Sequence, residues 1–329
     1  MALAVGWRPL LSQKLNMSIL SLSSGDLIAD RRAEYAEAML PGDANAASEI
    51  YLQALELRPD WVAGWFRLGE IRMAAGLPLA DDAFRRALDL DPEDRLGAAL
   101  CLDLLRDRSL ADAMPSAFVE TLFDQYAAGF EESLVEKLDY RAPELIASGL
   151  AGPLGRVLDL GCGTGLMGTH LRDRADWLEG WDISAEMLRE AGAKGIYDRL
   201  SKADLSALTP QAGRWDLVTA ADVFAYLGAL EQIVAWVAQA LRPGGRFAFT
   251  VEAHDGTEAY VLRPSRRFAH AAPHLATLLD HAGFDACLTP AVLRQDRGMP
   301  IHGLVVQAVR RGALDARQDA DRDRLVPLA

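Results

Sequence analysis

The stretch Val157-Leu158-Asp159-Leu160-Gly161-Cys162-Gly163-Thr164-Gly165 decides the fold of the larger part of this chain. It is a short apolar run that contains an aspartate, and glycine then occupies every second position. Leu166, Met167 and Leu171 follow with helical spacing. The pattern predicts a buried strand, a tight turn and the start of a helix. Glycines allow positive φ and let a ligand lie against the main chain, and the helix start adds unpaired N–H groups.

The composition limits the classes of protein and partner to consider. The chain has 329 residues, enough for two domains, and its apolar and charged fractions are those of an ordinary globular protein. Its net charge of −13 argues against nucleic acid or an anionic membrane as the main partner, because both require a basic surface. Arg263, Arg266 and Arg267 form the one dense basic group in the sequence.

Cysteine usage and hydropathy indicate the cellular compartment. Cys101, Cys162 and Cys287 are scattered and include no CxxC pair, which predicts neither a disulfide framework nor a metal site. No uninterrupted apolar run approaches the ~20 residues that span a bilayer. We therefore expect a cytoplasmic protein with reduced thiols and no membrane partner.

Strands and helices are expected to alternate from Arg156 onward, which predicts an α/β fold with a parallel sheet wound on both faces. Two later apolar stretches have no helix between them, and we expect them to form an antiparallel pair. The expected strands are 156–160, 177–182, 196–202, 215–220 and 246–252, then 286–294 and 303–309; the expected helices are 167–174, 185–191, 231–241 and 273–281.

Five segments of this region stand out: the glycine turn, Gly180-Trp181-Asp182-Ile183-Ser184, Ala203-Asp204-Leu205, 215–227 and 241–247. In this order and spacing they resemble the motifs of class I S-adenosylmethionine-dependent methyltransferases. The resemblance covers about Arg156 to Glu252 and points to the small-molecule branch that includes ubiquinone- and biotin-pathway enzymes. It implies a Rossmann-like, seven-stranded methyltransferase sheet, parallel with an antiparallel last strand.

The resemblance also implies the cofactor, S-adenosyl-L-methionine, and the residues that contact it. A carboxylate about 20 residues beyond a glycine turn is placed to accept ribose hydroxyls, and Asp182 has that spacing. Because a strand-end aspartate that faces a ligand is not a core residue, its loss is expected to leave the stability of the free protein nearly unchanged. The expected cofactor-binding residues are Asp159, Gly161, Gly163, Gly165, Asp182, Ile183, Met187, Asp204, Leu205, Ala220 and Tyr126.

The methyl acceptor is expected near the loop after the fourth strand, where Phe224 and Tyr226 are candidates for its contacts. A preceding helical segment, with Phe123, Tyr126, Phe130 and Tyr140, is expected to cover the site. A general base is needed only for a nucleophile that arrives protonated, and no catalytic residue is assigned. Candidate bases are His254, His270, Tyr226 and Glu252.

The N-terminal third repeats itself. Tyr51, Ala54 and Pro59 recur 33 positions later as Phe84, Ala87 and Pro92, with Trp65-x-x-Leu68-Gly69 between them. This pattern resembles the tetratricopeptide repeat (TPR) and implies an all-α, TPR-like helical domain. Roughly two repeats are fewer than the ~3 needed for independent stability, so we expect them to pack on the next domain, on another subunit or on a partner protein.

The expected organisation is a poorly ordered N-terminus over 1–25, helical repeats over 26–114, a methyltransferase domain over 115–311 and a charged tail over 312–329. Two other functions stay open. One is an NAD-dependent oxidoreductase that uses Gly163, Gly165 and Gly168, which the antiparallel finish disfavours; the other is a non-catalytic scaffold that binds cofactor. A small-molecule acceptor is expected, with a protein acceptor as the alternative.

Overall fold

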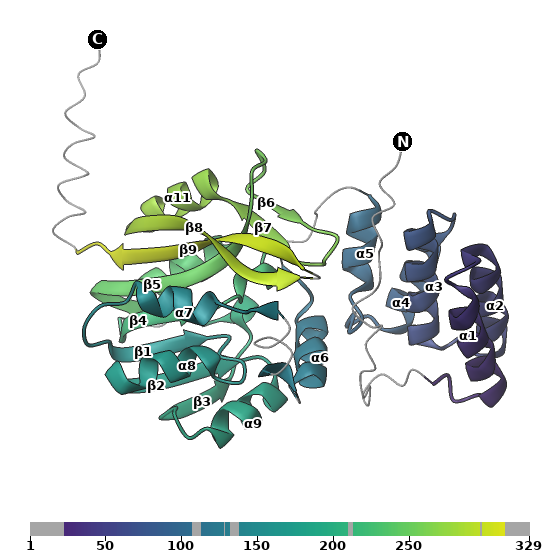
Figure 1. Cartoon of the computed structure of the whole chain (residues 1–329), viewed down its shortest axis with the longest axis horizontal. Helices are drawn as coiled ribbons and strands as arrows, with labels where there is room; N and C mark the ends of the chain where they lie inside the picture. Colours follow the sequence, from purple (N-terminus) through teal and green to yellow (C-terminus); the bar gives the residue numbers. More distant parts are fainter. Residues whose placement is uncertain are drawn as a thin grey trace, which may run out of the picture. The chain divides into compact units, whose positions relative to one another are not determined.

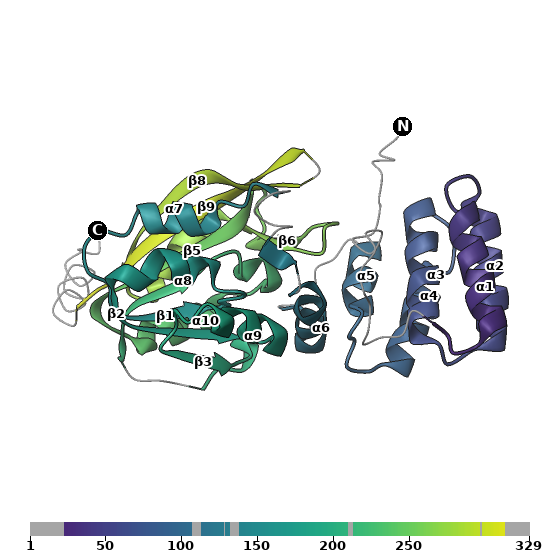
Figure 2. The same cartoon turned by 60° about the horizontal axis from the view of Figure 1, so that its bottom comes forward.

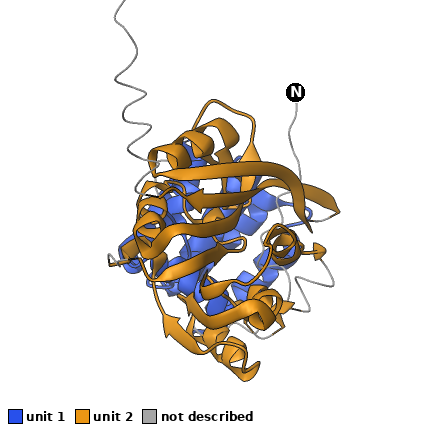
Figure 3. Ribbon diagram, turned by 90° about the vertical axis from the view of Figure 1, so that its left-hand side faces the viewer, with its two compact units in different colours: residues 1–125 blue, residues 126–329 orange. Residues whose placement is uncertain are grey.

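The computed structural model describes residues 23–106, 113–127, 129–131, 138–209, 213–296 and 298–312. They form two compact units, which divide after Gln125 (Figure 3). The expected domain boundary at 115 falls before this division and stays a prediction. The expected poorly ordered start and charged tail lie almost wholly outside the described residues.

The first unit is helical and is drawn from purple to blue in Figure 1. Consecutive helices pack against each other from α1 to α5, joined by short loops. The division between the units falls inside α6, so its last residue, Tyr126, belongs to the second unit. The helices are α1 (Leu27–Met39), α2 (Ala44–Leu57), α3 (Val62–Ala75), α4 (Ala80–Leu90), α5 (Ala98–Leu105) and α6 (Ser116–Tyr126).

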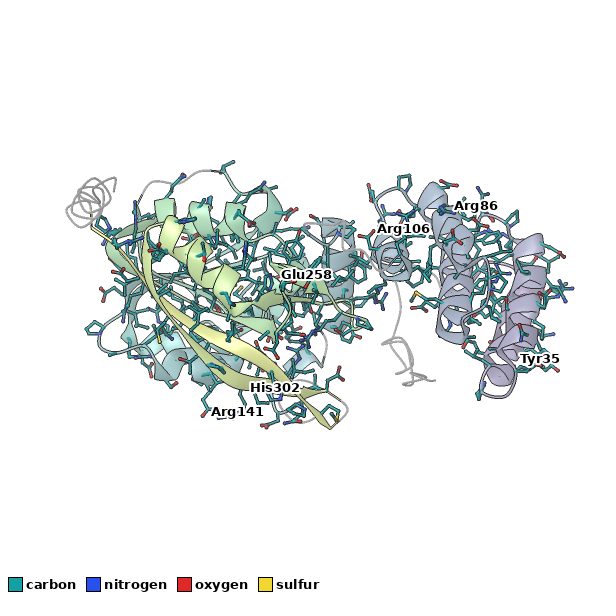
Figure 4. All side chains as sticks on the ribbon, turned by 90° about the horizontal axis from the view of Figure 1, so that it is seen from above. Tyr35, Arg86, Arg106, Arg141, Glu258 and His302 are labelled. Carbon is teal, nitrogen blue, oxygen red and sulfur yellow. The ribbon has the colours of Figure 1, made fainter. Side chains whose placement is uncertain are left out.

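The positions that recur in the sequence form the core of the first unit. The side chains of Tyr51 and Phe84 are buried. Gly69 lies so close to Phe84 that a Cβ there would come within 2.7 Å of the ring. The outer side chain of Tyr35, labelled in Figure 4, is 60% exposed. Small and aromatic residues at the repeated positions thus let α3 and α4 approach closely.

The second unit contains a sheet of nine strands among the described residues. The parallel strands lie in the order β3-β2-β1-β4-β5, and β9 then pairs antiparallel with β5 and with β8. The predicted antiparallel pair is therefore confirmed. The strands are β1 (Gly155–Leu160), β2 (Ala175–Asp182), β3 (Arg199–Lys202), β4 (Trp215–Ala220), β5 (Leu241–His254), β6 (Tyr260–Leu262), β7 (Phe268–Ala271), β8 (Phe284–Asp296) and β9 (Met299–Arg310).

The predicted count of seven strands is wrong. The two additional strands are β6 and β7, which lie between β5 and the next helix and have three and four residues. Segments of that length carry too little periodicity to be recognised in a sequence. They matter for the site because β7 pairs with the last three residues of β5, Glu252 to His254.

Helices cover both faces of the sheet (Figures 1 and 2). One face packs on α10 and α11 around Phe247 and Phe249, and the other packs on α7 and α8 around Val157 and Leu217. No helix in the described part of the chain is long and apolar enough to cross a membrane. The helices are α7 (Ala142–Ser148), α8 (Leu166–Leu171), α9 (Ala185–Ala193), α10 (Glu231–Ala240) and α11 (Ala272–His281).

The fold places the sequence motifs at one edge of the sheet. Because β1, β2 and β4 are parallel, their carboxyl ends meet there, at Leu160, Asp182 and Ala220. The glycine pair expected as a turn before the fifth strand becomes an irregular part of β5: Leu241 pairs with Trp215, and Arg246 with Leu217.

Candidate functional site

The glycine turn after β1 has the conformation that its sequence predicts. Gly161, Gly163 and Gly165 have φ of +60°, +53° and +92°, which L-residues rarely adopt. A Cβ on Gly161 would come within 2.5 Å of Val223. A Cβ on Gly163 would meet only the ring of Phe130, at 3.9 Å. Space for a ligand is therefore left beside Gly163, whereas the Val223 side chain leaves no room for a side chain at Gly161.

Asp182, at the end of β2, is joined to this turn. Its Oδ2 accepts the N–H of Gly163 at 2.8 Å, and its Oδ1 accepts the N–H of Ser184 at 2.8 Å. The side chain is only 7% exposed. The expectation that Asp182 is not a core residue is wrong, because its carboxylate is buried and ties the glycine turn to the start of α9.

Asp159 lies under the turn and is 1% exposed. Its oxygens accept the hydroxyls of Tyr197 at 2.7 Å and Thr219 at 2.8 Å. Burial raises the pKa of Asp159 to about 7, although the two hydroxyls lower it and Asp182 adds a further increase. Tyr197 was not expected at this site from the sequence. Its ring packs on Gly165 and would lie 2.5 Å from a Cβ on Gly168, so only the close approach of these glycines could have indicated it.

The other expected cofactor residues surround the carboxyl ends of β2, β3 and β4. Ile183 is half-buried and Met187 is fully buried in α9. Asp204 caps a short helical turn (Leu205–Ala207), its Oδ1 accepting from Ser206. Ala220 is buried at the end of β4. Their contacts with a cofactor stay predictions.

Tyr126 lies in a different group from the glycine turn. Burial raises the pKa of its phenol, with Tyr226, Arg266 and Arg267 as its electrostatic neighbours. Tyr140, from the same preceding segment, donates its hydroxyl to the carbonyl of Ala221 at 3.3 Å. The segment therefore contributes tyrosines beside the loop after β4. The positions 128 and 132–137 of the expected covering segment lie outside the described residues.

Glu131 connects this preceding segment to the glycine turn. Its Oε1 accepts the hydroxyl of Thr164 at 2.6 Å and pairs with the ammonium of Lys194 at 2.5 Å. Lys194 follows α9 directly. These contacts hold the segment at residues 129–131 against both the turn and the end of α9.

The two residues expected to contact the methyl acceptor, Phe224 and Tyr226, lie in different environments. Phe224 is fully buried and packs on Phe247 and Phe249, so its proposed contact with an acceptor is wrong. Tyr226 instead lies under the guanidinium of Arg267, 5.7 Å from its ring centroid. Periodicity could not separate the two aromatics, because they occupy one short helical turn (Phe224–Tyr226).

The candidate bases also differ in their surroundings. Glu252 is 1% exposed and forms an ion pair with Arg294, so its carboxyl group is part of a structural pair. Burial lowers the pKa of His270 to about 4, so this imidazole is neutral near pH 7. Its Nε2 lies 3.0 Å from the carbonyl of Leu227. In the neutral ring Nε2 therefore carries the proton, and Nδ1 has no hydrogen-bond partner in the described structure.

Sequence comparison agrees with this geometry. Residues 157–245 match the family model described as "Methyltransferase domain". The second unit thus contains a region that is similar to methyltransferase domains. Among the described residues, no group of three or more histidine, cysteine, aspartate or glutamate side chains could hold a metal ion.

Named relatives share part of this region. The chain is 32% identical over 148 residues to a malonyl-[acyl-carrier protein] O-methyltransferase from Enterobacter lignolyticus, covering 45% of this chain and 58% of that protein. It is 33% identical over 110 residues to a ubiquinone biosynthesis O-methyltransferase from Aromatoleum aromaticum, covering 31% and 45%. A methyltransferase structure from Mesorhizobium loti shares 23% identity, with a TM-score of 0.42 over 51% of this chain and 96% of that one. The chain thus spans about half the length of these curated relatives.

Proposed function

We propose that this chain transfers a methyl group from S-adenosyl-L-methionine to a small molecule. The observation that carries the proposal is the pairing of Asp182 with Gly163 at the carboxyl edge of the sheet. The pairing sets a carboxylate beside a glycine that has open space where a Cβ would project. A ribose ligand requires these two features together.

The residues present fit this cofactor, which supplies a methyl group bound to a sulfonium and therefore electrophilic. Asp182 would accept the ribose hydroxyls, and the main chain at Gly163 would lie against the cofactor. Ile183 and Met187 would flank the adenine, and Asp204 would accept from its amine. The small side chain of Ala220 would leave room for the methionine part.

Asp159 has a supporting role in this proposal. Its oxygens are engaged by Tyr197 and Thr219, and it is almost fully buried. It would therefore act by holding the turn and by its charge. A cationic ligand nearby favours the ionised carboxylate, so binding of the cofactor would be accompanied by proton release from Asp159.

The names of the relatives support a small acceptor methylated on oxygen, and a protein acceptor remains the alternative. We further propose that the N-terminal helices are TPR-like repeats that bind another protein or subunit, and that the protein is cytoplasmic. The repeats are supported by the buried positions Tyr51 and Phe84 and by the tight contact at Gly69.

Titration calorimetry with S-adenosylmethionine and with NAD tests the cofactor. We expect binding of the first and none of the second. Tight binding of NAD alone would instead support the oxidoreductase. Incubation of cell extract with methyl-labelled S-adenosylmethionine then tests catalysis, and label in the small-molecule fraction is the expected result. Cofactor binding with no protein-dependent labelling of any fraction would support the non-catalytic scaffold.

A further inference from the structure

A second group of charged side chains lies beyond the carboxyl ends of β4 and β5. We call it the arginine cluster and define it by Asp222, Glu252, Arg263, Arg267 and Arg294. Arg294, from β8, donates from Nη1 to both oxygens of Asp222 at 2.9 Å and from Nη2 to Glu252. It is 4% exposed, and these bonds fix the two carboxylates in place.

Asp222 is itself held in an unusual conformation. Its φ is +59°, in the left-handed region that aspartate tolerates better than most residues. Its N–H donates to the hydroxyl of Thr250 at 2.9 Å. The carboxylate of Asp222 therefore has a defined direction, which is what a binding site on a loop requires.

Arg267 lies beside these two carboxylates, but its Nη1 donates a hydrogen bond to neither of them. That atom lies 3.6 Å from Oδ2 of Asp222 and 3.7 Å from Oε1 of Glu252, which exceeds hydrogen-bonding distance. It is buried and has no hydrogen-bond partner in the described part of the chain. Since a buried N–H without an acceptor is costly, this atom is suited to an acceptor supplied by a ligand.

The local charge favours an anion. Arg263 lies 3.9 Å from Glu252, and the charge of Arg266 acts on Tyr126. Asp296 adds a carboxylate that acts on Arg267. Four arginines (263, 266, 267 and 294) against three carboxylates (222, 252 and 296) leave one net positive charge, in a chain whose total is −13. Figure 4 also labels Glu258, on the loop between β5 and β6, which is outside this count.

We propose that Arg267 binds a carboxylate carried by the methyl acceptor. The carboxylate accepts from Nη1 of Arg267, while Asp222 and Glu252 hold the guanidinium over Tyr226 and Arg294 holds those two acids. The assignment rests on the proposed function, because it places the acceptor beside β4 and β5 and leaves the cofactor beside Asp182. The carboxylate is the group by which the acceptor is held, and the atom that receives the methyl group is not assigned by it.

Fluorine NMR titration of the full-length protein with 4-fluorobenzoate, and with the neutral 4-fluorobenzamide, tests the proposal. An aromatic probe is chosen because Tyr126 and Tyr226 are neighbours of Arg267. A charged hydrogen bond is expected to make the carboxylate bind at least ~10-fold more tightly than the amide, a factor that corresponds to about 1.4 kcal/mol. In Arg267→Gln the acid and the amide should bind about equally, while the dissociation constant of S-adenosylhomocysteine changes by less than about twofold.

Two further variants keep the result interpretable. Arg242→Gln removes the same charge from a half-exposed arginine that pairs with Asp216 at the other end of β4, and it should keep the preference. Arg267→Lys keeps a cation beside Asp222 and Glu252 if Arg267→Gln does not fold, and it should lower the preference without abolishing it. Equal binding of acid and amide by the wild type, or an unchanged preference in both Arg267 variants, would overturn the proposal.

The probe titrations are carried out both with and without S-adenosylhomocysteine to separate the two proposals. Probe binding that depends on Arg267, in a protein that binds no S-adenosylhomocysteine, would leave the carboxylate site standing and remove the methyltransferase function. Binding of S-adenosylhomocysteine with no preference for the carboxylate would do the reverse.

Discussion

Replacement of Asp182 by alanine should affect both cofactor binding and stability, for different reasons. Binding should weaken because the carboxylate would accept the ribose hydroxyls. A hydrogen bond to a charged acceptor contributes about 1.5–3 kcal/mol, so loss of one or two should raise the dissociation constant of S-adenosylmethionine at least ~10-fold. Calorimetric titration measures this change.

The same substitution should lower the free energy of unfolding of the ligand-free protein. It removes the acceptor of two N–H groups, those of Gly163 and Ser184. Each unsatisfied buried donor costs about 1–3 kcal/mol, so a loss of about 2 kcal/mol or more is expected in urea unfolding. Asp176→Ala, at the exposed start of β2, removes the same charge from the same strand and should change neither quantity appreciably.

A cofactor analogue separates direct contact from damage to the turn. The 2′-deoxy form of S-adenosylhomocysteine should bind the wild type about 10-fold more weakly than the parent compound. In Asp182→Ala the two compounds should bind equally, since the acceptor of that hydroxyl is gone. If the wild type does not distinguish them, or if the variant distinguishes them as the wild type does, Asp182 does not bind the ribose.

Four further outcomes are expected. The pKa of Asp159 is raised from 3.8 to about 7 in the folded protein, so the unfolded state loses its proton first as pH rises. The free energy of unfolding should therefore fall by up to about 4 kcal/mol between about pH 4 and 7. Urea unfolding of Asp159→Asn at several pH values should lack this slope, and an identical slope would exclude Asp159 as its source. Gly163→Ala should lower cofactor affinity at least ~10-fold. Gly195→Ala, with φ of +63° and nothing near its Cβ, should lose about as much stability as Gly163→Ala and keep its cofactor affinity. Equal affinities of the two variants would show that the space beside Gly163 is not the site. A chain that begins at Pro115 should bind S-adenosylmethionine as well as the full chain, and loss of binding in a folded protein would show that the helical repeats share the site. Tyr126→Ala should reduce methyl transfer more than melting temperature, and equal loss of both would indicate packing alone.

Local pattern was sufficient for the cofactor half of the second unit. The glycine turn could be predicted because positive φ at alternate positions demands glycine, and its position after an apolar strand defines the edge of the sheet. The spacing from Gly163 to Asp182 then followed from one strand-helix-strand unit. The antiparallel pair β8 and β9 was predictable because no helix separates the two stretches. Each inference used residues that are close in sequence.

Tertiary structure decided what the side chains at that edge do. Asp182 was read as a ligand group, and only the folded chain shows its two bonds to backbone N–H groups. Tyr197, just before β3, reaches Asp159 in β1 across β2, and no spacing rule connects them. Phe224 and Tyr226 are two residues apart and have opposite environments, because one enters the core and the other lies beneath Arg267.

The glycine turn and the carboxylate that follow two parallel strands could be recognised in the sequence, and so could the basic group 263–267 in an otherwise acidic chain. The arginine cluster depends on the fold most strongly. The partners of the basic group, Asp222, Glu252 and Arg294, come from the ends of β4 and β5 and from β8. They meet because β9 pairs with both β5 and β8, which brings distant segments to one edge. Charge pairing across such distances is set by strand order, and that order is a property of the packed sheet.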